Sequence, residues 1–397
     1  MTTAAHGRRT VRLLRLVIDV AGGWAETTAR AAYLRPRGRM TLVAQLTVNR
    51  IPMLIGDVLL SSETRTGLKV NLPLVGDINQ ILANRGFPFE VRFAQKLHVF
   101  EGRVAVGWSG PALQAKRALE VIAAISSRQG LTEADIKLEL NAIDPDKIDQ
   151  LQLVGLIIED QNGTNVKYSG FSLQAPFIEI RNLGRVCGAG SGASAFFELL
   201  QKGDFLGQPD ANVYQVAHGL LAALTNEEYR TGNTIANRWG GGFEALTFSP
   251  RSREFEKIGD ILHTFWKIKE GEDDTLGLLP FFYKTAYWRD ALVLRTAWAE
   301  DIRDNYLTLK FNDITLIPPL LKNIEEYDIA ELGEIDFSYR AVCCHVLIEK
   351  TDGRDLLFIA DQRQARQDII FSVDQAGGPL QLTEYLPNII RERLTFG

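Results

Sequence analysis

The sequence has little cysteine, with only three among its 397 residues. Cys343 and Cys344 are adjacent and would point to opposite faces of a strand, while Cys187 stands alone. This pattern excludes a disulfide framework and a CxxC metal motif, and it indicates a reducing compartment. His345, beside Cys344, lacks the spacing of a metal-ligand pair. We therefore expect a cytoplasmic protein that uses neither a metal nor a cofactor.

Long apolar runs and an excess of one charge are also missing. No run approaches the roughly 20 apolar residues that cross a bilayer. The chain carries 44 basic and 49 acidic residues, a formal charge of −5, and they are spread without a basic stripe for phosphate backbones. We expect neither a membrane nor a nucleic acid as partner. With 46% hydrophobic residues the chain can bury two cores, so we expect two folded units.

The first 39 residues have a composition of their own, with eight arginines, no lysine and two acids. An arginine-rich, acid-poor start resembles a transit peptide. It also fits a cleaved propeptide, a retained N-terminal helix, or a mis-set start with translation beginning at Met40. In that last case, excision of the methionine would expose Thr41. We treat residues 1–40 as a leader or a mis-set start.

Strand patterns begin at Thr41. Two runs of branched apolar residues, 41–49 and 52–62, flank the turn signal Asn49-Arg50 and predict a hairpin that turns Asp57 back towards Thr41. Gly110 and Pro111 then open a helical pattern, since proline suits the first helical turn. Further elements are expected as a short helix within 75–90, strands at 96–100 and 103–110, helices from 112 and 132, strands at 153–160, 165–173 and 177–190, helices at 193–201 and 212–229, and strands at 233–237 and 243–248. This grouping predicts an α+β fold, and specifically a four-layer αββα sandwich over residues 41–250.

Five matches in order make this part of the chain resemble a proteasome-type β subunit of the N-terminal nucleophile (Ntn) hydrolases. In that family the mature chain starts at a threonine, followed by an aspartate at the spacing of Thr41 and Asp57. A lysine precedes a glycine by fourteen residues, as Lys96 precedes Gly110. A GSG turn leads into a helix, as at 190–192, with Ser191 at its centre. An acid lies 37 residues after that serine, which gives Glu228, and the family's D-x-x-S-G reads EYRTG here, with Thr231.

The resemblance implies a threonine-type peptidase or amidase that assembles into homo-oligomers and acts on peptides or proteins. A hydroxyl is a weak nucleophile, and the α-amine of an N-terminal Thr41 could serve as its base. A Lys96 ammonium would lower the proton affinity of the site, and we expect Asp57 to hold it by a hydrogen bond. The N–H of Gly110 is expected to stabilise the oxyanion. Ser191, Glu228 and Thr231 are expected to support the amine.

The chain departs from the family pattern in three places. The stretch between Asp57 and Lys96 is longer than usual, which makes Lys69 a competing lysine. Glu228 is one methylene longer than the family's aspartate. Met40 stands where self-cleaving precursors have glycine, and without cleavage the α-amine would not exist.

Two other functions stay open. Gly188, Gly190 and Ala193 fit the spacing G-x-G-x-x-A of a dinucleotide site, with Asp210 as the acid further on. The other alternative keeps the hydrolase fold without the activity, as a scaffold or regulatory subunit.

Residues 251–397 are predicted to form an accessory α+β region. The segments 254–268 and 278–307 are interpreted as helices with aromatic faces, and 341–361 as a hairpin around Asp352-Gly353. We expect their tryptophans to pack onto the hydrolase unit. The sequence does not indicate the role of this region, the substrate or the oligomer size.

Overall fold

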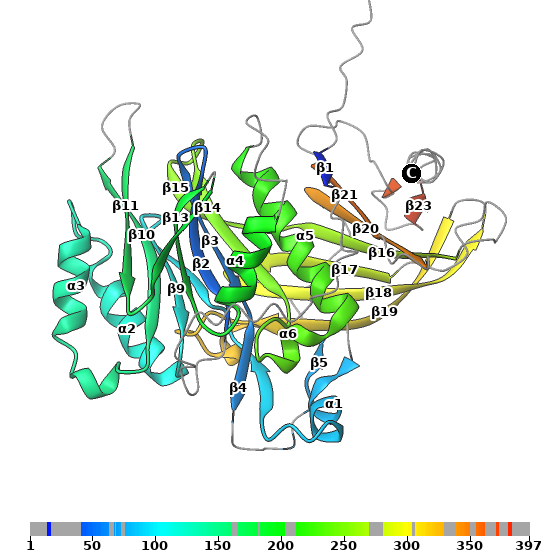
Figure 1. Ribbon diagram of the computed structural model, residues 1–397, viewed down its shortest axis with the longest axis horizontal. Coiled ribbons are helices and arrows are strands. Elements are labelled where there is room, and N and C mark those ends of the chain that lie inside the picture. The colour runs from blue at the N-terminus through cyan, green and yellow to red at the C-terminus, as the bar shows by residue number, and fades with distance from the viewer. Residues whose placement is uncertain are drawn as a thin grey trace, which may run out of the picture.

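The computed structural model describes residues 14–16, 41–62, 67, 69–72, 76–160, 166–181, 183–202, 212–269, 281–303, 306–328, 339–349, 355–361, 371–372 and 380–382. Within these residues the chain is a mixed α+β protein with six α-helices and mostly antiparallel sheets (Figure 1). The expected α+β class is therefore correct. Residues 1–13 and 17–40, which include most of the expected leader, lie outside the described residues.

Two sheets form the half of the molecule that begins at residue 41. A six-stranded sheet has the order β12 (Phe177–Ile180), β13 (Gly184–Ala189), β2 (Val43–Val48), β3 (Ile51–Asp57), β14 (Phe243–Ser249), β15 (Glu254–Ile258). A four-stranded sheet has the order β11 (Lys167–Leu173), β10 (Gln152–Asp160), β9 (Val104–Ser109), β8 (Leu97–Phe100). Two small pairs, β4 (Leu59–Ser62) with β7 (Glu90–Phe93) and β5 (Asn71–Leu72) with β6 (Gly76–Asp77), complete this half.

The two larger sheets pack face to face. Val43 and Leu54 from the six-stranded sheet share one buried cluster with Ala105 and Val154 from the four-stranded sheet. The sheets approach closely at Gly107, where an added Cβ would lie 2.3 Å from a methyl of Val43. In each of the two sheets, alternate apolar side chains along the strands point into this interface, as expected for sheets that pack face to face.

Helices cover the outer face of each sheet. Helices α2 (Ala112–Ile125) and α3 (Glu133–Asn141) pack on the four-stranded sheet through Leu119 and Ile136. Helices α4 (Ala193–Lys202) and α5 (Val213–Thr231) pack on the six-stranded sheet through Phe196 and Leu220. The remaining helices are α1 (Ile78–Asn84), α6 (Asn233–Ala236) and the short 3₁₀ turns η1 (Pro145–Lys147) and η3 (Ile324–Glu326).

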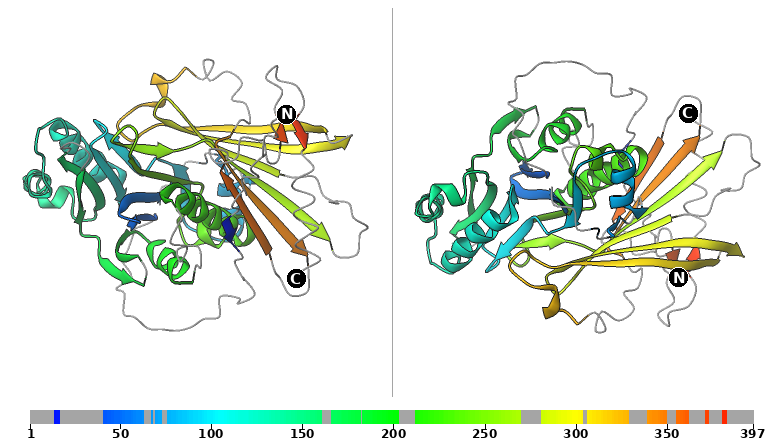
Figure 2. Two further views of the ribbon diagram at one scale, coloured as in Figure 1. Left: turned by 90° about the horizontal axis from the view of Figure 1, so that it is seen from above. Right: turned by 90° about the horizontal axis from the view of Figure 1, so that it is seen from below.

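A nine-stranded sheet lies on the other side of α5, and the C-terminal region supplies all of its strands except β1. Its order is β1 (Leu14–Leu16), β21 (Asp355–Asp361), β20 (Ala341–Glu349), β16 (Ile261–Lys269), β17 (Phe281–Trp288), β18 (Ala291–Arg303), β19 (Tyr306–Ile317), β23 (Leu380–Leu382), β22 (Phe371–Ser372), with only β16 and β20 parallel. Helix α5 contacts β3 and β14 on one side and β20 and β21 on the other, and Figure 2 shows it between these strands.

Several local predictions are wrong. The expected helices at 254–268 and 278–307 are strands β15 to β18 and the start of β19. In β17 the residues from Phe281 to Ala286 are all buried, so both faces of this strand are covered. The segment 233–237 is mostly helix α6 rather than a strand. Leu113 follows the apolar spacing of the predicted helix from 112, which favours burial, but it is 62% exposed.

Other predictions are confirmed. The hairpin β2–β3, the helices α1, α2 and α3, and the hairpin β20–β21 all form where expected. Strand β15 still belongs to the six-stranded sheet, so this sheet extends beyond residue 250. No helix among the described residues is long and apolar enough to cross a membrane.

Candidate functional site

The hairpin β2–β3 brings Thr41 and Asp57 into contact. The Thr41 hydroxyl, which is fully buried, donates a hydrogen bond to Oδ1 of Asp57. The Asp57 N–H donates to the carbonyl of Leu42 at 2.9 Å, which fixes the end of β3 against the start of β2. The expectation that Asp57 faces back towards Thr41 is therefore confirmed.

A glycine turn before β14 binds the second oxygen of this carboxylate. The Gly240 N–H donates to Oδ2 of Asp57 at 2.7 Å. Gly240 has φ +107°, and a Cβ there would lie 2.1 Å from Oε2 of Glu228. Only glycine combines this backbone conformation with so close an approach to a side chain.

Lys96 is buried in the same region, but its partners differ from those expected. Its Nζ lies 3.9 Å from the centre of the Trp108 ring. The ammonium has no hydrogen-bond partner within the described residues, so the expected hydrogen bond to Asp57 is not formed. Glu244 positions the backbone instead, because its Oε1 accepts from the N–H groups of Lys96 at 2.6 Å and Leu97 at 2.9 Å.

Burial and neighbouring charges shift the pKa values of Asp57 and Lys96 in opposite directions. Burial raises the pKa of Asp57 above its ordinary value, and the nearby Lys96 ammonium counteracts part of that rise. Burial lowers the pKa of Lys96, and the charges of Asp57 and Glu244 counteract it. The two groups therefore stabilise each other's charged form through space, without a direct hydrogen bond.

Glu228 lies near the C-terminal end of α5 and is fully enclosed. Its Oε2 accepts from the Gly241 N–H at 2.7 Å and from the Thr234 hydroxyl at 3.3 Å. Burial raises the pKa of Glu228 to about 8, and the nearby charge of Asp57 adds to the rise. The side chain is therefore protonated at neutral pH. Thr231 lies in α5, and its side chain is outside the described residues.

The GSG turn lies against the backbone of Thr41. The Gly192 N–H donates to the Thr41 carbonyl at 3.0 Å, and a Cβ on Gly190 would lie 2.0 Å from that carbonyl oxygen. Ser191 is exposed, and its hydroxyl donates a hydrogen bond to the Asn237 carbonyl at 3.1 Å. This hydrogen bond does not involve Thr41.

Two further predicted positions take no part in the contacts described above. Gly110 has φ +123°, and the atoms nearest to an added Cβ belong to Gln150 and Leu151. Lys69, the competing lysine, is exposed, whereas Lys96 is buried beside Asp57. The structure therefore brings together Thr41, Asp57, Lys96 and Glu228, and it leaves Lys69 outside the cluster.

The glycines of the dinucleotide pattern are occupied by the chain itself. A Cβ on Gly188 would lie 2.5 Å from the Phe197 ring, and Gly190 faces the Thr41 carbonyl. Strand β13 pairs antiparallel with β12 and β2, so the parallel βαβ unit of such a site is not formed around it. Asp210 lies outside the described residues.

Sequence reasoning missed three contributors: the glycine turn at 240–242, Glu244 and Trp108. The triple glycine was the available signal, because three consecutive glycines indicate a backbone that approaches other groups closely. Glu244 gave no signal, since an acid within an apolar strand pattern shows its partners only in the folded chain.

Comparison with protein-family models and with curated proteins finds no match to this chain. Within the described residues, no group of three or more metal-ligating side chains is close enough to hold a metal ion. The geometry around Thr41 is therefore the strongest indication of function in this chain.

Proposed function

We propose that this protein is a proteasome-like N-terminal threonine hydrolase that cleaves peptide or other amide bonds with Thr41 as nucleophile. The observation that supports this most is the buried cluster of Thr41, Asp57 and Lys96 at the start of β2. A hydroxyl, a carboxylate and an ammonium in a water-poor site are the groups that activate a threonine.

The proposed reaction requires a peptide bond to be cut before residue 41, because in the intact chain the Thr41 nitrogen is an amide. The freed α-amine takes the hydroxyl proton while Oγ1 attacks the substrate carbonyl carbon. The tetrahedral intermediate collapses to an ester on Thr41, and the leaving amine takes the proton. Water then attacks the ester, which releases the acid and restores the hydroxyl.

The remaining predicted residues take supporting roles in this proposal. The Lys96 ammonium favours the deprotonated hydroxyl by its charge, and Asp57 keeps that ammonium charged. The Gly110 N–H is assigned to the oxyanion, and Ser191 and Thr231 to the surroundings of the amine. Glu228, which is protonated at neutral pH, holds the glycine turn that binds Asp57.

The layers support an Ntn-hydrolase fold, which we also propose. Two face-to-face antiparallel sheets carry helix pairs on their outer faces, in the order α, β, β, α. The proposed nucleophile lies at the start of a central strand of the six-stranded sheet. We place the boundary of this unit after β15, with the nine-stranded sheet as the accessory region.

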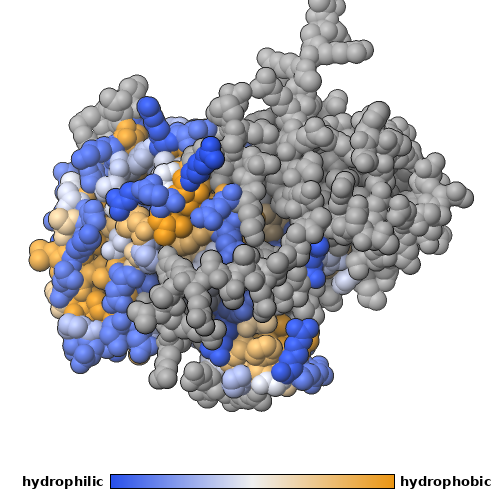
Figure 3. All heavy atoms as spheres, viewed as in Figure 1, coloured by the Kyte–Doolittle hydropathy of each residue, from blue (hydrophilic) through white to orange (hydrophobic). Residues whose placement is uncertain are grey.

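Self-association is part of the proposal. Leu113 on α2 is 62% exposed and Leu138 on α3 is 70% exposed. Figure 3 shows hydrophobic side chains gathered over the part of the surface where α2 and α3 lie. Exposed apolar clusters of this kind are typical of interaction surfaces, which fits a cytoplasmic homo-oligomer that acts on peptides or proteins.

Two substitutions at Thr41 test the assignment. Thr41→Ser keeps a hydroxyl and should retain turnover of peptide and amide substrates, while Thr41→Ala should abolish it with the fold intact by circular dichroism. The alanine variant should also lose about 1–3 kcal/mol of unfolding free energy, because Asp57 loses its donor. Equal turnover by the wild type and Thr41→Ala would contradict the assignment of Thr41 as the nucleophile.

One observation favours an inactive scaffold as a second candidate. Thr41 is fully buried and its hydroxyl is already bound by Asp57, an arrangement that also suits a purely structural threonine. A scaffold would show no turnover in either the wild type or the serine variant, and its assembly would be unchanged by Thr41→Ser.

A further inference from the structure

The buried Lys96 ammonium depends on its own backbone for its position. Its Nζ lies over the Trp108 ring, 3.9 Å from the ring centre, and has no hydrogen-bond partner among the described residues. A lysine carries its charge on a flexible four-carbon stem, so an ammonium without such a partner moves with the backbone that carries it. The contacts of residues 95–97 therefore determine where this charge lies relative to Thr41 and Asp57.

Glu244, on β14, holds the backbone of this segment and is itself held by the C-terminal sheet. Its Oε1 accepts from the N–H groups of Lys96 at 2.6 Å and Leu97 at 2.9 Å. Its Oε2 accepts from the hydroxyl of Tyr287, on β17, at 3.2 Å, and the ammonium of Lys257, on β15, lies 3.9 Å away. One oxygen of this buried carboxylate therefore binds the segment, and the other binds the C-terminal sheet.

Gln95 makes a second connection to the C-terminal sheet. Its Nε2 donates to the carbonyl of Asp290, in the turn between β17 and β18, at 2.9 Å, and to the carbonyl of Ile317, at the end of β19, at 2.6 Å. An amide has two N–H donors, so both are used in binding the sheet. The backbone carbonyl of Gln95 accepts from the Trp108 indole N–H at 3.1 Å.

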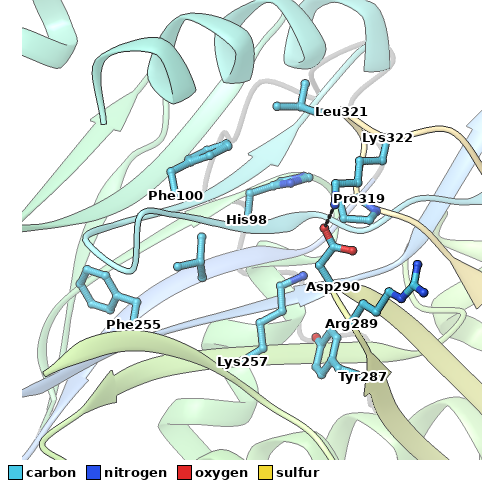
Figure 4. A pocket seen from close by; sticks show the side chains of 11 residues that line it. His98, Phe100, Phe255, Lys257, Tyr287, Arg289, Asp290, Pro319, Leu321 and Lys322 are labelled. Atoms are coloured by element: carbon cyan, nitrogen blue, oxygen red, sulfur yellow. Dashed lines mark ion pairs between the residues drawn. The ribbon is translucent and has the colours of Figure 1, made fainter. Parts of the chain in front are cut away.

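Lys257 joins the two connections. Its ammonium donates to the side-chain oxygen of Gln95, pairs with Glu244, and lies 4.8 Å from the centre of the Tyr287 ring. Figure 4 shows the side chains of Lys257, Tyr287 and Asp290 in the wall of one pocket. Buried polar networks whose members are paired hold the groups that they connect rigidly.

We propose that the C-terminal sheet positions the Lys96 ammonium in the proposed hydrolase site, with Glu244, Gln95 and Tyr287 as positioning residues. Glu244 and Gln95 fix the backbone of the Lys96 segment, and Tyr287 fixes Glu244 from the sheet. The catalytic effect of this linkage rests on the proposed function, whereas the linkage itself can be measured without turnover.

Tyr287→Phe tests the linkage with a small change, because it removes the hydroxyl bound to Glu244 and keeps the ring. We expect kcat for a fluorogenic peptide amide to fall about fivefold with KM unchanged, since in the proposed reaction Lys96 acts on the charge that develops at Oγ1. Tyr214→Phe is the matched control, because the Tyr214 hydroxyl, in the first turn of α5, also donates to a carboxylate, that of Glu256. It should leave both constants unchanged.

The second readout is the indole N–H signal of Trp108 in the full chain labelled with ¹⁵N-tryptophan, assigned by its loss in Trp108→Phe. This N–H binds the Gln95 carbonyl, and the Lys96 ammonium lies over the ring, so the signal reports the position of the segment. Tyr287→Phe should shift the signal, and Tyr214→Phe should not.

A pH titration of the same signal tests the charge of Glu244. Burial lowers the pKa of Lys96 to about 8, against the opposing effect of Asp57 and Glu244, so the wild-type signal should titrate near pH 8. Glu244→Gln keeps an oxygen for the two backbone N–H groups and removes one of these charges, so its midpoint should move to lower pH. An unchanged midpoint would contradict the role of Glu244.

The two readouts distinguish failure of the linkage from failure of the hydrolase function. An unchanged Trp108 signal in Tyr287→Phe, an unchanged kcat in an active enzyme, or the same changes in Tyr214→Phe would overturn the proposal. A wild type without turnover would contradict the hydrolase function instead, and the Trp108 signal would still show whether the C-terminal sheet positions Lys96.

Discussion

At the scale of single residues, the arrangement around Asp57 is what distinguishes this site from an ordinary strand end. One carboxylate oxygen accepts from the Thr41 hydroxyl and the other from the Gly240 N–H, while the Lys96 charge lies nearby without a hydrogen bond. Asp57 therefore couples the proposed nucleophile to the glycine turn. The role of Lys96 in this arrangement is electrostatic, and a substitution can isolate it.

Lys96→Met keeps the length of the side chain and its packing on Trp108 but removes the charge. Asp57 would then be a buried carboxylate without its compensating cation, so the free energy of unfolding near pH 7 should fall by about 3 kcal/mol. Without Lys96 the pKa of Asp57 should rise further, so the carboxyl becomes neutral and the loss smaller near pH 5.

Urea unfolding at the two pH values measures this difference. Lys137→Met is the matched control, since Lys137 is exposed and paired with Glu133, and its loss should stay below about 1 kcal/mol at both pH values. A Lys96→Met loss that is the same at both pH values would show that packing, not charge, makes Lys96 important.

A second prediction at the residue scale concerns the stability of a variant at Gly240. Gly240→Ala forces a side chain into φ +107° and places its Cβ 2.1 Å from Glu228, so we expect a loss of about 3 kcal/mol or more. Gly130→Ala is the control, because Gly130 also has a positive φ, +67°, with open space around it, and should cost only about 1–2 kcal/mol. Thermal unfolding of both variants measures these losses of stability. Equal losses would show that the close approach to Glu228 does not contribute to the cost of the substitution at Gly240.

At the scale of elements, the end of α5 and the glycine turn form one unit through Glu228. The native pKa of this carboxyl is about 8, above its ordinary value of 4.5, so between these values the folded state binds more protons than the unfolded state. Its contribution to stability is therefore fully present below about pH 4.5 and is lost as the pH rises through about 8.

Glu228→Gln should remove this dependence, since the amide imitates the neutral acid and can still accept from the Gly241 N–H. The variant should gain stability relative to the wild type as the pH rises from about 5 to 8, by on the order of a few kcal/mol. Urea midpoints across this range measure it. A constant difference between the two proteins across the range would contradict a raised pKa for Glu228.

Some helices and strands could be predicted from the sequence, and others could not. The β2–β3 hairpin and α3 were predictable because local chemistry fixes them, through Asn49-Arg50 at positive φ and the Thr132 capping box. The strands β16 to β18 were mistaken for helices, because an apolar segment buried on both faces lacks a strand's alternation, as in Phe281 to Ala286. This burial comes from tertiary contacts, such as the packing of Tyr229 of α5 on Phe265 and Phe281.

At the scale of the whole molecule, α5 is buried between two sheets, and this placement connects the C-terminal region to the site. Tyr229 on α5 packs on Phe265 of β16 with ring centres 4.2 Å apart, one residue from Glu228. Tyr283 of β17 reaches the glycine turn, since a Cβ on Gly242 would lie 2.9 Å from its hydroxyl. The C-terminal sheet therefore helps to hold the turn that binds Asp57 and Glu228.

The candidate site was only partly predictable from the sequence, because its geometry depends on contacts between segments that are distant in the chain. Thr41, Asp57, Lys96 and Glu228 follow a spacing pattern, and the structure brings them together. The partners that tune them, Trp108, Glu244 and the turn at 240–242, are distant in sequence and carry no spacing of their own. Ionisation states depend on such partners and on burial, which a sequence pattern does not supply.

The most direct test of Thr41 as an N-terminal nucleophile is the intact mass and N-terminal sequence of the protein purified from its own host. We predict a mature chain that begins at Thr41, because only then does the threonine have a free α-amine to act as base. A chain that retains Met40 or begins at Met1 would leave Thr41 without this amine and would contradict the proposed N-terminal nucleophile.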